Sequence, residues 1–289
     1  MGLRWGQRTL VMGVINLTPD SFSDGGRFER PERALAQARR MLAAGADVLD
    51  LGAQSTRPGA AEVGSAGELK RLLPTLRLIR VACPEALISV DTFLAPVAEA
   101  ALAAGADWVN DVRGASSLRD PAMLELVAAA GCPYVLMHSR GDSAAMDGLA
   151  HYGDVVAEVR DGLRAASDAA LKAGLKPEQL IWDPGLGFAK TTEQNLALLR
   201  GLPILRAEGF PLLLGPSRKR FIGAVLDQPR ANGRLWGTAA VCAQAITAGV
   251  DVLRVHDVAP IVQTTRMLDA IVRVPGQGPG ADLSVQPAV

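Results

Sequence analysis

The sequence lacks several features that would place it in a special class of protein. It has only three cysteines, Cys83, Cys132 and Cys242, which are far apart and form no C-x-x-C pair. A disulfide framework and a cysteine-rich zinc site are therefore not expected. Each cysteine has small apolar neighbours, so we expect all three in the core. A reducing compartment is the simplest setting, and we expect a cytoplasmic protein.

An excess of charge of either sign is also missing. Lys and Arg together number 30, as do Asp and Glu, so nothing points to nucleic acid or to an anionic membrane as partner. No segment approaches the ~18–20 uninterrupted apolar residues of a membrane span. We expect small ligands bound at a local site.

A short sequence pattern, here called a phrase, recurs along the chain. AAGADVLD ends at Asp50, AAGADWVND at Asp111 and TAGVDVLRVHD at Asp257, and looser copies lie between them. Each joins a helical stretch, a glycine, a short apolar run and then polar residues. Helices commonly end at a left-handed glycine, and short apolar runs without alternation are typical of parallel strands buried on both faces. The repeat glycines are Gly45, Gly105, Gly131, Gly174, Gly209 and Gly249.

Helix and strand alternate along the chain, which predicts an α/β fold. Eight candidate strands fit a single (β/α)8 TIM barrel, a fold of about 250 residues. The alternative is a doubly wound open sheet, whose G-x-G-x-x-G fingerprint is absent after the first strand. We assign residues 1–272 to the barrel and the Gly- and Pro-rich residues 273–289 to a tail expected to be disordered. The candidate strands are Leu10–Leu17, Val48–Ala53, Leu87–Thr92, Trp108–Val112, Tyr134–Ser139, Leu180–Asp183, Pro211–Ser217 and Val252–Val258.

Active sites of this fold lie at the C-terminal ends of the strands, where this sequence places both acids and bases. Asp91, Asn110 and Asp183 suit a ligand edge with several N–H donors. Strand alternation puts Arg254 and His256 on one face of the last strand. These two residues, with Lys219 and Arg57, suit an anion such as phosphate or diphosphate.

Single residues at these positions also have structural interpretations. Thr92, Asp111 and Asp257 are equally consistent with helix caps, and His138 with a hydrogen-bonded core histidine. Asn16 is consistent with a turn ahead of Pro19. Only the whole set at one barrel mouth points to a ligand with a donor-rich heterocycle and a phosphate tail.

Seven ordered motifs resemble those of dihydropteroate synthases, the folate-pathway enzymes inhibited by sulfonamides. They are VMGVINLTPDSFSDGG, STRPG, SVDT, NDV, DPGLGFAK, GPSRKRFIG and RVHDV, and the resemblance extends from Leu10 to about Val272. It implies a transferase that condenses 6-hydroxymethyl-7,8-dihydropterin diphosphate with p-aminobenzoate to give 7,8-dihydropteroate and diphosphate, with Mg²⁺ as cofactor. It also implies a homodimer, formed through the apolar segments RLWGTAAVCAQAITAG and PIVQTTRMLDAIV.

The resemblance assigns roles to individual residues, each by its motif. Lys219, Arg254, His256 and Arg57 are the expected catalytic residues. The pterin site comprises Asp91, Asn110, Met137, Asp183, Gly215 and Lys219. The diphosphate site comprises Asn16, Arg57, Arg254 and His256, and Asn16 also reaches the metal. The p-aminobenzoate site comprises Thr56, Pro58, Phe188, Arg220 and Ser217, with Lys219 beside them.

A mechanism follows from what these motifs contain. No nucleophile–base pair is present, so we expect a dissociative displacement in which fixed charges stabilise a departing diphosphate and a pterin cation. The polar residues from Asn16 to Asp24, followed by Gly25 and Gly26, predict a mobile loop after the first strand. Together with the STRPG loop after the second strand, it would exclude water from the cation.

Three positions depart from the family pattern. Ala53 and Gln54 stand where the family often has Gly and Glu. Arg220 stands where many relatives have Ser, which affects the expected p-aminobenzoate contacts rather than the chemistry. Other functions stay open at this point: a methyltetrahydrofolate-dependent methyltransferase domain, a non-enzymatic relative that binds pterins or a protein, and an unrelated phosphate-binding barrel. The diphosphate motifs, the intact loop motifs and the acid/amide set, respectively, argue against them.

Overall fold

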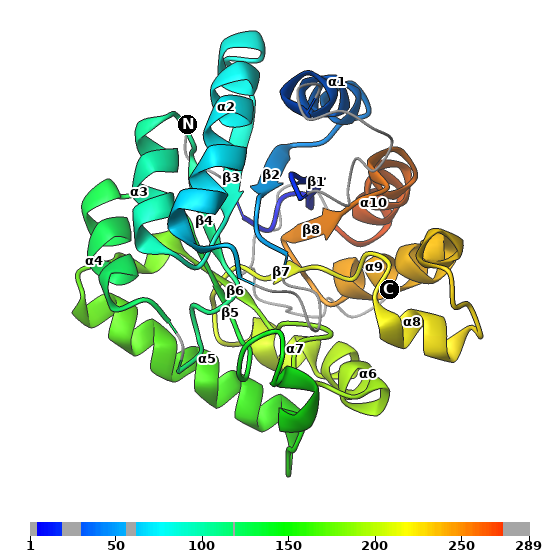
Figure 1. Cartoon of the computed structure of the whole chain (residues 1–289). Coiled ribbons are helices and arrows are strands. Elements are labelled where there is room, and N and C mark those ends of the chain that lie inside the picture. Colours follow the sequence, from blue (N-terminus) through cyan, green and yellow to red (C-terminus); the bar gives the residue numbers. More distant parts are fainter. Residues whose placement is uncertain (1–4, 19–29, 56–61, 118, 274–289) are drawn as a thin grey trace, which may run out of the picture.

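The computed structural model describes residues 5–18, 30–55, 62–117 and 119–273. Eight parallel strands form a barrel surrounded by helices (Figure 1), so the predicted (β/α)8 fold is confirmed. The strand order is β6-β5-β4-β3-β2-β1-β8-β7, and a bridge between Trp182 and Leu212 joins the two ends. The strands are β1 (Leu10–Asn16), β2 (Val48–Gly52), β3 (Leu87–Asp91), β4 (Trp108–Asp111), β5 (Tyr134–Met137), β6 (Leu180–Asp183), β7 (Leu213–Leu214) and β8 (Val252–Val255).

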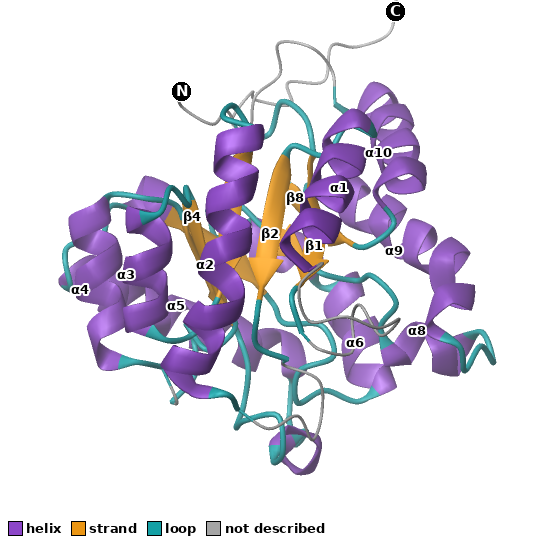
Figure 2. Cartoon of the chain, turned by 45° about the horizontal axis from the view of Figure 1, so that its top comes forward, coloured by secondary structure: helices purple, strands orange, loops and turns teal. Residues whose placement is uncertain are grey.

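The helices pack around the outside of these strands, and the loops of the barrel mouth lie at the arrowheads (Figure 2). The α-helices are α1 (Arg30–Ala43), α2 (Gly64–Ala82), α3 (Ala95–Ala103), α4 (Pro121–Ala130), α5 (Val155–Lys172), α6 (Thr192–Arg200), α7 (Leu202–Arg206), α8 (Arg220–Val225), α9 (Leu235–Thr247) and α10 (Val258–Val272). Short 3-10 turns are η2 (Met146–Leu149), η3 (Pro177–Gln179) and η4 (Ala231–Arg234).

Local signals in the sequence set the ends of several helices. Asp120 caps α4 by accepting from the backbone N–H of Ala122, and Pro121 fills the first helical position. Gly131 ends the same helix with a φ of 67°, a conformation that a side chain disfavours. The other five repeat glycines also have positive φ. The predicted helix–glycine–strand unit is therefore confirmed.

The last two strands are shorter than predicted. The extended runs 211–217 and 252–258 reduce to β7 and β8 because their C-terminal residues bond to each other across the two loops. The Ser217 hydroxyl accepts from the backbone N–H of His256 at 3.1 Å. Arg218 donates twice to Asp257, at 2.9 and 2.6 Å. Asp257 makes no side-chain cap on α10, so the capping interpretation is wrong for this residue.

The barrel interior changes from apolar to polar along its axis. Its N-terminal end is filled by apolar side chains from seven strands, with Met12 and Trp108 among the largest. Alternation along the strands then directs Asp50, Ser89 and Arg254 into the next layer. The apolar floor therefore carries a charged middle layer directly below the mouth.

The described structure extends one residue past the predicted end of the barrel domain, to Arg273. Arg273, the first residue assigned to the tail, pairs with Asp269 at 2.8 Å and donates to the carbonyls of Gly6 and Val250. These bonds join the end of α10 to the segments that precede β1 and β8. Residues 274–289 lie outside the described residues, so the disorder expected there stays a prediction.

Other expectations from composition are met in part. Cys242 is buried, whereas Cys83 and Cys132 are partly exposed and pack against the core edge. Within the described ranges, every helix is too short or too polar to cross a lipid bilayer.

Candidate active site

Strand register brings the predicted polar residues to one mouth. Asn16 pairs with Gly52, Gly52 with Asp91, and Asp91 with Asn110 in successive ladders. On the far side of the barrel, Met137 pairs with Asp183. The sequence placed Asn16, Asp91, Asn110 and Asp183 at strand ends, and the structure brings them together there.

A buried charge network lies directly under this ring of residues. The Arg254 guanidinium donates to Asp50 Oδ2 at 2.6 Å and to Asp91 Oδ2 at 2.5 Å. The Asn110 amide donates to the same Asp50 oxygen at 3.3 Å. Burial lowers the pKa of Arg254 most strongly, but Asp50 and Asp91 together outweigh it and raise the pKa above its usual value. Arg254 is thus a permanent cation held between two acids.

Burial has the opposite effect on the carboxyl groups of the mouth. Desolvation raises the pKa of Asp91 to about 7, with Arg254 lowering it and Asp50 and Glu68 raising it. Desolvation also raises the pKa of Asp183, whose Oδ1 accepts from the backbone N–H of Gly185 at 2.8 Å. Both carboxyl groups would gain from a ligand that brings N–H donors to replace the lost water.

Lys219 stands across the mouth from these acids, at the N-terminus of α8. Its ammonium lies 4.4 Å from the centre of the Phe188 ring. Burial lowers the pKa of Lys219 to about 8, and the charge of Asp183 is the largest opposing effect. Lys219 and Phe188 therefore form one wall in which a cation and an aromatic face are both presented.

Three further predicted residues also line this part of the barrel. Met137 is buried in a small apolar cluster with Phe93 and Val112, against which Phe188 packs. An added Cβ at Gly215 would come no closer than 4.0 Å to Arg254 Cβ, so this position leaves space beside the base of the Arg254 side chain. Ser217, the third, is hydrogen-bonded to His256.

His256 lies just beyond β8 and is held as a neutral ring. Its Nδ1 lies 3.0 Å from Ser217 Oγ, which also accepts from the His256 backbone N–H. Burial, followed by the nearby charge of Arg254, lowers the pKa of His256 to about 3. Since the Ser217 hydroxyl can donate to Nδ1, the ring proton is expected on Nε2. His256 can thus offer an N–H donor, not the positive charge that sequence reasoning allowed.

Arg220 begins α8 but does not stand alone. It donates to both oxygens of Asp147 in η2, at 2.7 and 3.2 Å, and both side chains are more than half exposed. The two residues join the loop after β5 to the start of α8 across the edge of the mouth. Sequence reasoning identified Arg220 but not this partner.

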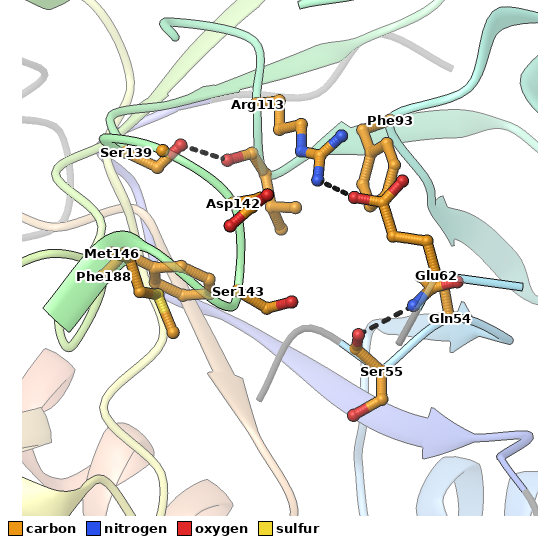
Figure 3. A pocket seen from close by; sticks show the side chains of 12 residues that line it. Gln54, Ser55, Glu62, Phe93, Arg113, Ser139, Asp142, Ser143, Met146 and Phe188 are labelled. Atoms are coloured by element: carbon orange, nitrogen blue, oxygen red, sulfur yellow. Dashed lines mark hydrogen bonds and ion pairs between the residues drawn. The ribbon is translucent and has the colours of Figure 1, made fainter. Parts of the chain in front are cut away.

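A hollow beside the mouth is shown in Figure 3, bounded by loops that follow β2, β3, β4, β5 and β6. The Arg113 guanidinium lies 3.8 Å from the centre of the Phe93 ring and pairs with Glu62. At the same edge, the Gln54 side chain accepts from the backbone N–H of Val63 at 2.9 Å and donates to the Ser55 carbonyl. Gln54 therefore braces both stems of the loop after β2.

Several predicted positions fall on undescribed parts of the chain. Thr56, Arg57 and Pro58 lie outside the described residues, as do Gly25, Gly26 and most of the first loop. Of the described residues, no three His, Cys, Asp or Glu side chains form a group able to hold a metal ion.

Sequence reasoning missed the most deeply buried acid of the site. Asp50 has no solvent exposure, and its contact with Arg254 joins residues 204 positions apart. The signal was available, because Asp50 interrupts an apolar strand and ends one of the recurring phrases. The role of Asp50 was not predicted because its partner, Arg254, lies in the last repeat.

Asp111, expected as a possible helix cap, is also part of the interior. It accepts from the Tyr134 hydroxyl at 2.7 Å and from the Arg113 backbone N–H at 2.8 Å. Burial raises its pKa to about 6. Asp111 therefore closes the turn after β4, while Asp120 caps the helix that follows.

The matched family agrees with this barrel and this set of polar residues. A family described as pterin-binding enzymes matches residues 12–256, and the chain therefore belongs to the pterin-binding enzymes. Within them it belongs to the dihydropteroate synthases. It is 50% identical over 269 residues to the dihydropteroate synthase of Synechocystis, covering 93% of this chain and 92% of the relative.

Solved structures give the same result. A Clostridium difficile dihydropteroate synthase, determined in the presence of pteroic acid, matches with a TM-score of 0.88 and 40% identity, covering 94% of this chain and 100% of the other. The Xanthomonas albilineans enzyme in complex with 7,8-dihydropteroate matches with a TM-score of 0.83 and 41% identity, covering 93% and 96%. The chain is thus a transferase of folate synthesis, and the expectation from its motifs is confirmed over the alternatives.

Proposed function

We propose that this barrel mouth condenses 6-hydroxymethyl-7,8-dihydropterin diphosphate with p-aminobenzoate through the residues described above. The observation that carries the assignment is the facing pair of Asp183 and Lys219, both buried and both with pKa values shifted towards neutrality by burial. A pterin edge with N–H donors and ring acceptors would satisfy both groups. Asp91 and Asn110 would complete that edge, with Met137 and Gly215 against the ring.

The diphosphate would lie above Arg254 and beside His256. Arg254 keeps its charge at all pH values of interest, and His256 offers a neutral N–H donor. Arg57, which lies outside the described residues, is proposed as a further partner on the strength of its motif. Together these groups would stabilise negative charge as it builds on the leaving diphosphate.

The donor set at the end of β1 suits Mg²⁺. The Asn16 side chain makes no hydrogen bond to any residue that the structure describes, and it offers one hard oxygen. Mg²⁺ keeps several waters and takes most other ligands from phosphate oxygens, so a single protein oxygen is enough. Bound there, the ion would neutralise diphosphate charge and hold it in line for departure.

The p-aminobenzoate ring would pack on Phe188, next to Lys219. Its carboxylate would approach Arg220 and Ser217, with Thr56 and Pro58 proposed from their motif. Ser217 and His256 are hydrogen-bonded, but displacement of diphosphate needs no enzyme nucleophile, so we assign the chain an electrostatic and positional contribution. Asp91 and Asp183 would stabilise the pterin cation while the neutral aryl amine attacks its exocyclic carbon.

An assay of diphosphate release tests this proposal directly. Purified protein is mixed with dihydropterin diphosphate, p-aminobenzoate and Mg²⁺, and the variant Lys219→Ala is measured beside it. We expect the variant to lose on the order of 10²–10³ in kcat/KM, the loss typical of one preorganised charge. Absence of release by folded wild-type protein would contradict the activity. Unchanged release by the variant would contradict the site assignment alone.

We also propose a homodimer formed through α9 and α10. These helices expose Trp236, Met267 and Ile271, at 78%, 61% and 62% of their full areas. Such exposure of large apolar side chains is typical of association surfaces. A cytoplasmic location is proposed as well, from the scattered cysteines, which suit a reducing compartment.

A further inference from the structure

Lys190 has its ammonium group enclosed by neutral acceptors. Only 9% of the residue is exposed. Its Nζ lies 2.9 Å from the Phe188 carbonyl, 3.1 Å from the Gly185 carbonyl and 3.2 Å from His138 Nδ1, with the His138 carbonyl at 3.4 Å. A buried lysine is uncommon, and no carboxylate pairs with this one among the described residues. The side chain therefore acts by joining backbone carbonyls.

The carbonyls reach the ammonium because the loop after β6 adopts a tight conformation. Gly185, Gly187 and Ala189 have φ values of 69°, 76° and 49°. An added Cβ at Gly185 would lie 2.0 Å from the His138 carbonyl oxygen. The left-handed Ala189 is an unfavourable conformation that surrounding contacts must hold, and the Lys190 ammonium supplies several of those contacts.

The loop held in this way carries one wall of the aminobenzoate site. The Phe188 carbonyl is the closest acceptor of Lys190, and the Phe188 ring faces the Lys219 ammonium. An added Cβ at Gly187 would lie 3.1 Å from Lys219 Cδ. A shift of residues 185–190 would therefore displace the aromatic ring and disturb its contact with Lys219.

Asp183, at the base of the same loop, is anchored in β6 and has one side-chain bond to the loop, from the Gly185 N–H at 2.8 Å. Its backbone carbonyl accepts from the His138 N–H at 2.9 Å, and its own position lies within β6. Loss of the Lys190 contacts would thus affect Phe188 more than the pterin carboxylate.

We propose that Lys190 is a positioning residue for p-aminobenzoate, acting through the loop that presents Phe188. The inference rests on the proposed contact between Phe188 and the aminobenzoate ring. It assigns a role in the reaction to a side chain outside the proposed substrate contacts.

The test compares steady-state kinetics of Lys190→Met and of the matched control Lys172→Met, which changes an exposed lysine of α5. We expect Lys190→Met to raise the KM for p-aminobenzoate about tenfold, equivalent to about 1.4 kcal/mol, and the KM for dihydropterin diphosphate less than twofold. The control should leave both KM values unchanged. Lys190→Gln, which keeps two donors, should give an intermediate effect, and it replaces Lys190→Met if that variant does not fold.

A double-mutant cycle with Phe188→Ala distinguishes positioning from general loss of structure. If Lys190 acts through Phe188, its substitution should add less than twofold to the KM for p-aminobenzoate once the ring is gone. An undiminished effect of Lys190→Met in the Phe188→Ala background would overturn the inference. So would a lowered melting temperature with both KM values unchanged. If Phe188→Ala alone leaves the KM unchanged, the proposed contact itself is wrong and the inference falls with it.

Discussion

Arg254 shows how a single residue can serve both the fold and the chemistry. Its guanidinium pairs with Asp50 below and Asp91 at the mouth, and Asn110 shares the lower acid. The arginine is therefore positioned before any ligand arrives, which reduces the reorganisation needed during the reaction. Asp50 holds this arrangement without reaching the mouth itself.

The substitution Asp50→Asn tests that role. Removing one of its two acid partners leaves the buried Arg254 charge only partly compensated, and we expect a loss of roughly 3 kcal/mol in unfolding free energy. A loss of kcat/KM should accompany it, because Arg254 would no longer be held against the diphosphate. Urea denaturation and the diphosphate assay measure the two effects. Asp161→Asn, at an exposed ion pair, is the control, and equal behaviour of the two variants would contradict the prediction.

The pair of Arg220 and Asp147 predicts a substitution that improves substrate binding instead of impairing activity. Asp147 accepts both hydrogen bonds from the Arg220 guanidinium, which we assign to the substrate carboxylate. Asp147→Asn should therefore leave Arg220 available to that carboxylate. We expect the KM for p-aminobenzoate to fall about two- to fivefold, the scale of an exposed ion pair. The exposed Asp168→Asn should have no effect in the same assay. A raised KM in Asp147→Asn would show that Asp147 supports, rather than competes for, the arginine.

At the scale of elements, helix α2 carries a buried acid close to Asp91. Burial raises the pKa of Glu68 to about 7, with the Thr92 hydroxyl and the charge of Arg71 lowering it in part. Thr92 approaches the carboxyl group, but neither Glu68 oxygen has a partner of normal hydrogen-bond geometry in the described part of the chain. The folded protein therefore favours the protonated form of this side chain.

Stability should consequently decrease as Glu68 ionises. The pKa of Glu68 in the folded protein lies above its unfolded value of about 4.5. The stability that protonated Glu68 contributes is therefore fully present below pH 4.5 and is lost as the pH rises through 7. Glu68→Gln removes this pH dependence. The unfolding free energy of the variant should exceed that of the wild type by on the order of 1 kcal/mol at pH 5, rising to about 3 kcal/mol at pH 8. Urea denaturation at both pH values measures the gain. The exposed Glu125→Gln should show none, and a gain that shrinks with pH would contradict the sign.

The elements also show what the sequence could predict. Six repeat phrases located six of the eight strands and the glycines that end the helices, and apolar runs located the other two strands, because these signals are local. The lengths of β7 and β8 were not predictable, since the bonds of Ser217 and Arg218 to the loop after β8 join separate repeats. Asp50, Lys190 and the partner of Arg220 were missed for the same reason.

At the scale of the whole molecule, the exposed apolar side chains of α9 and α10 predict association. Ile271→Glu should convert the proposed homodimer to a monomer, because a charge placed in an apolar interface loses its hydration. Sedimentation velocity at micromolar concentration measures the change. Val81→Glu alters an equally apolar, 82% exposed position on α2 and should leave the dimer intact. A monomeric wild-type protein would contradict the proposal.

The barrel closes between β6, which ends at Asp183, and β7, which precedes Lys219. Seven strand pairings form continuous ladders, whereas β6 and β7 meet through the bridge of Trp182 and Leu212. Asp183 ends β6, Phe188 follows it, and Lys219 follows β7. The Asp183 carboxyl group and the Lys219 ammonium therefore lie on opposite sides of this closure. A ligand that contacts both groups would link β6 and β7, which are joined directly only by the bridge of Trp182 and Leu212 among the described residues.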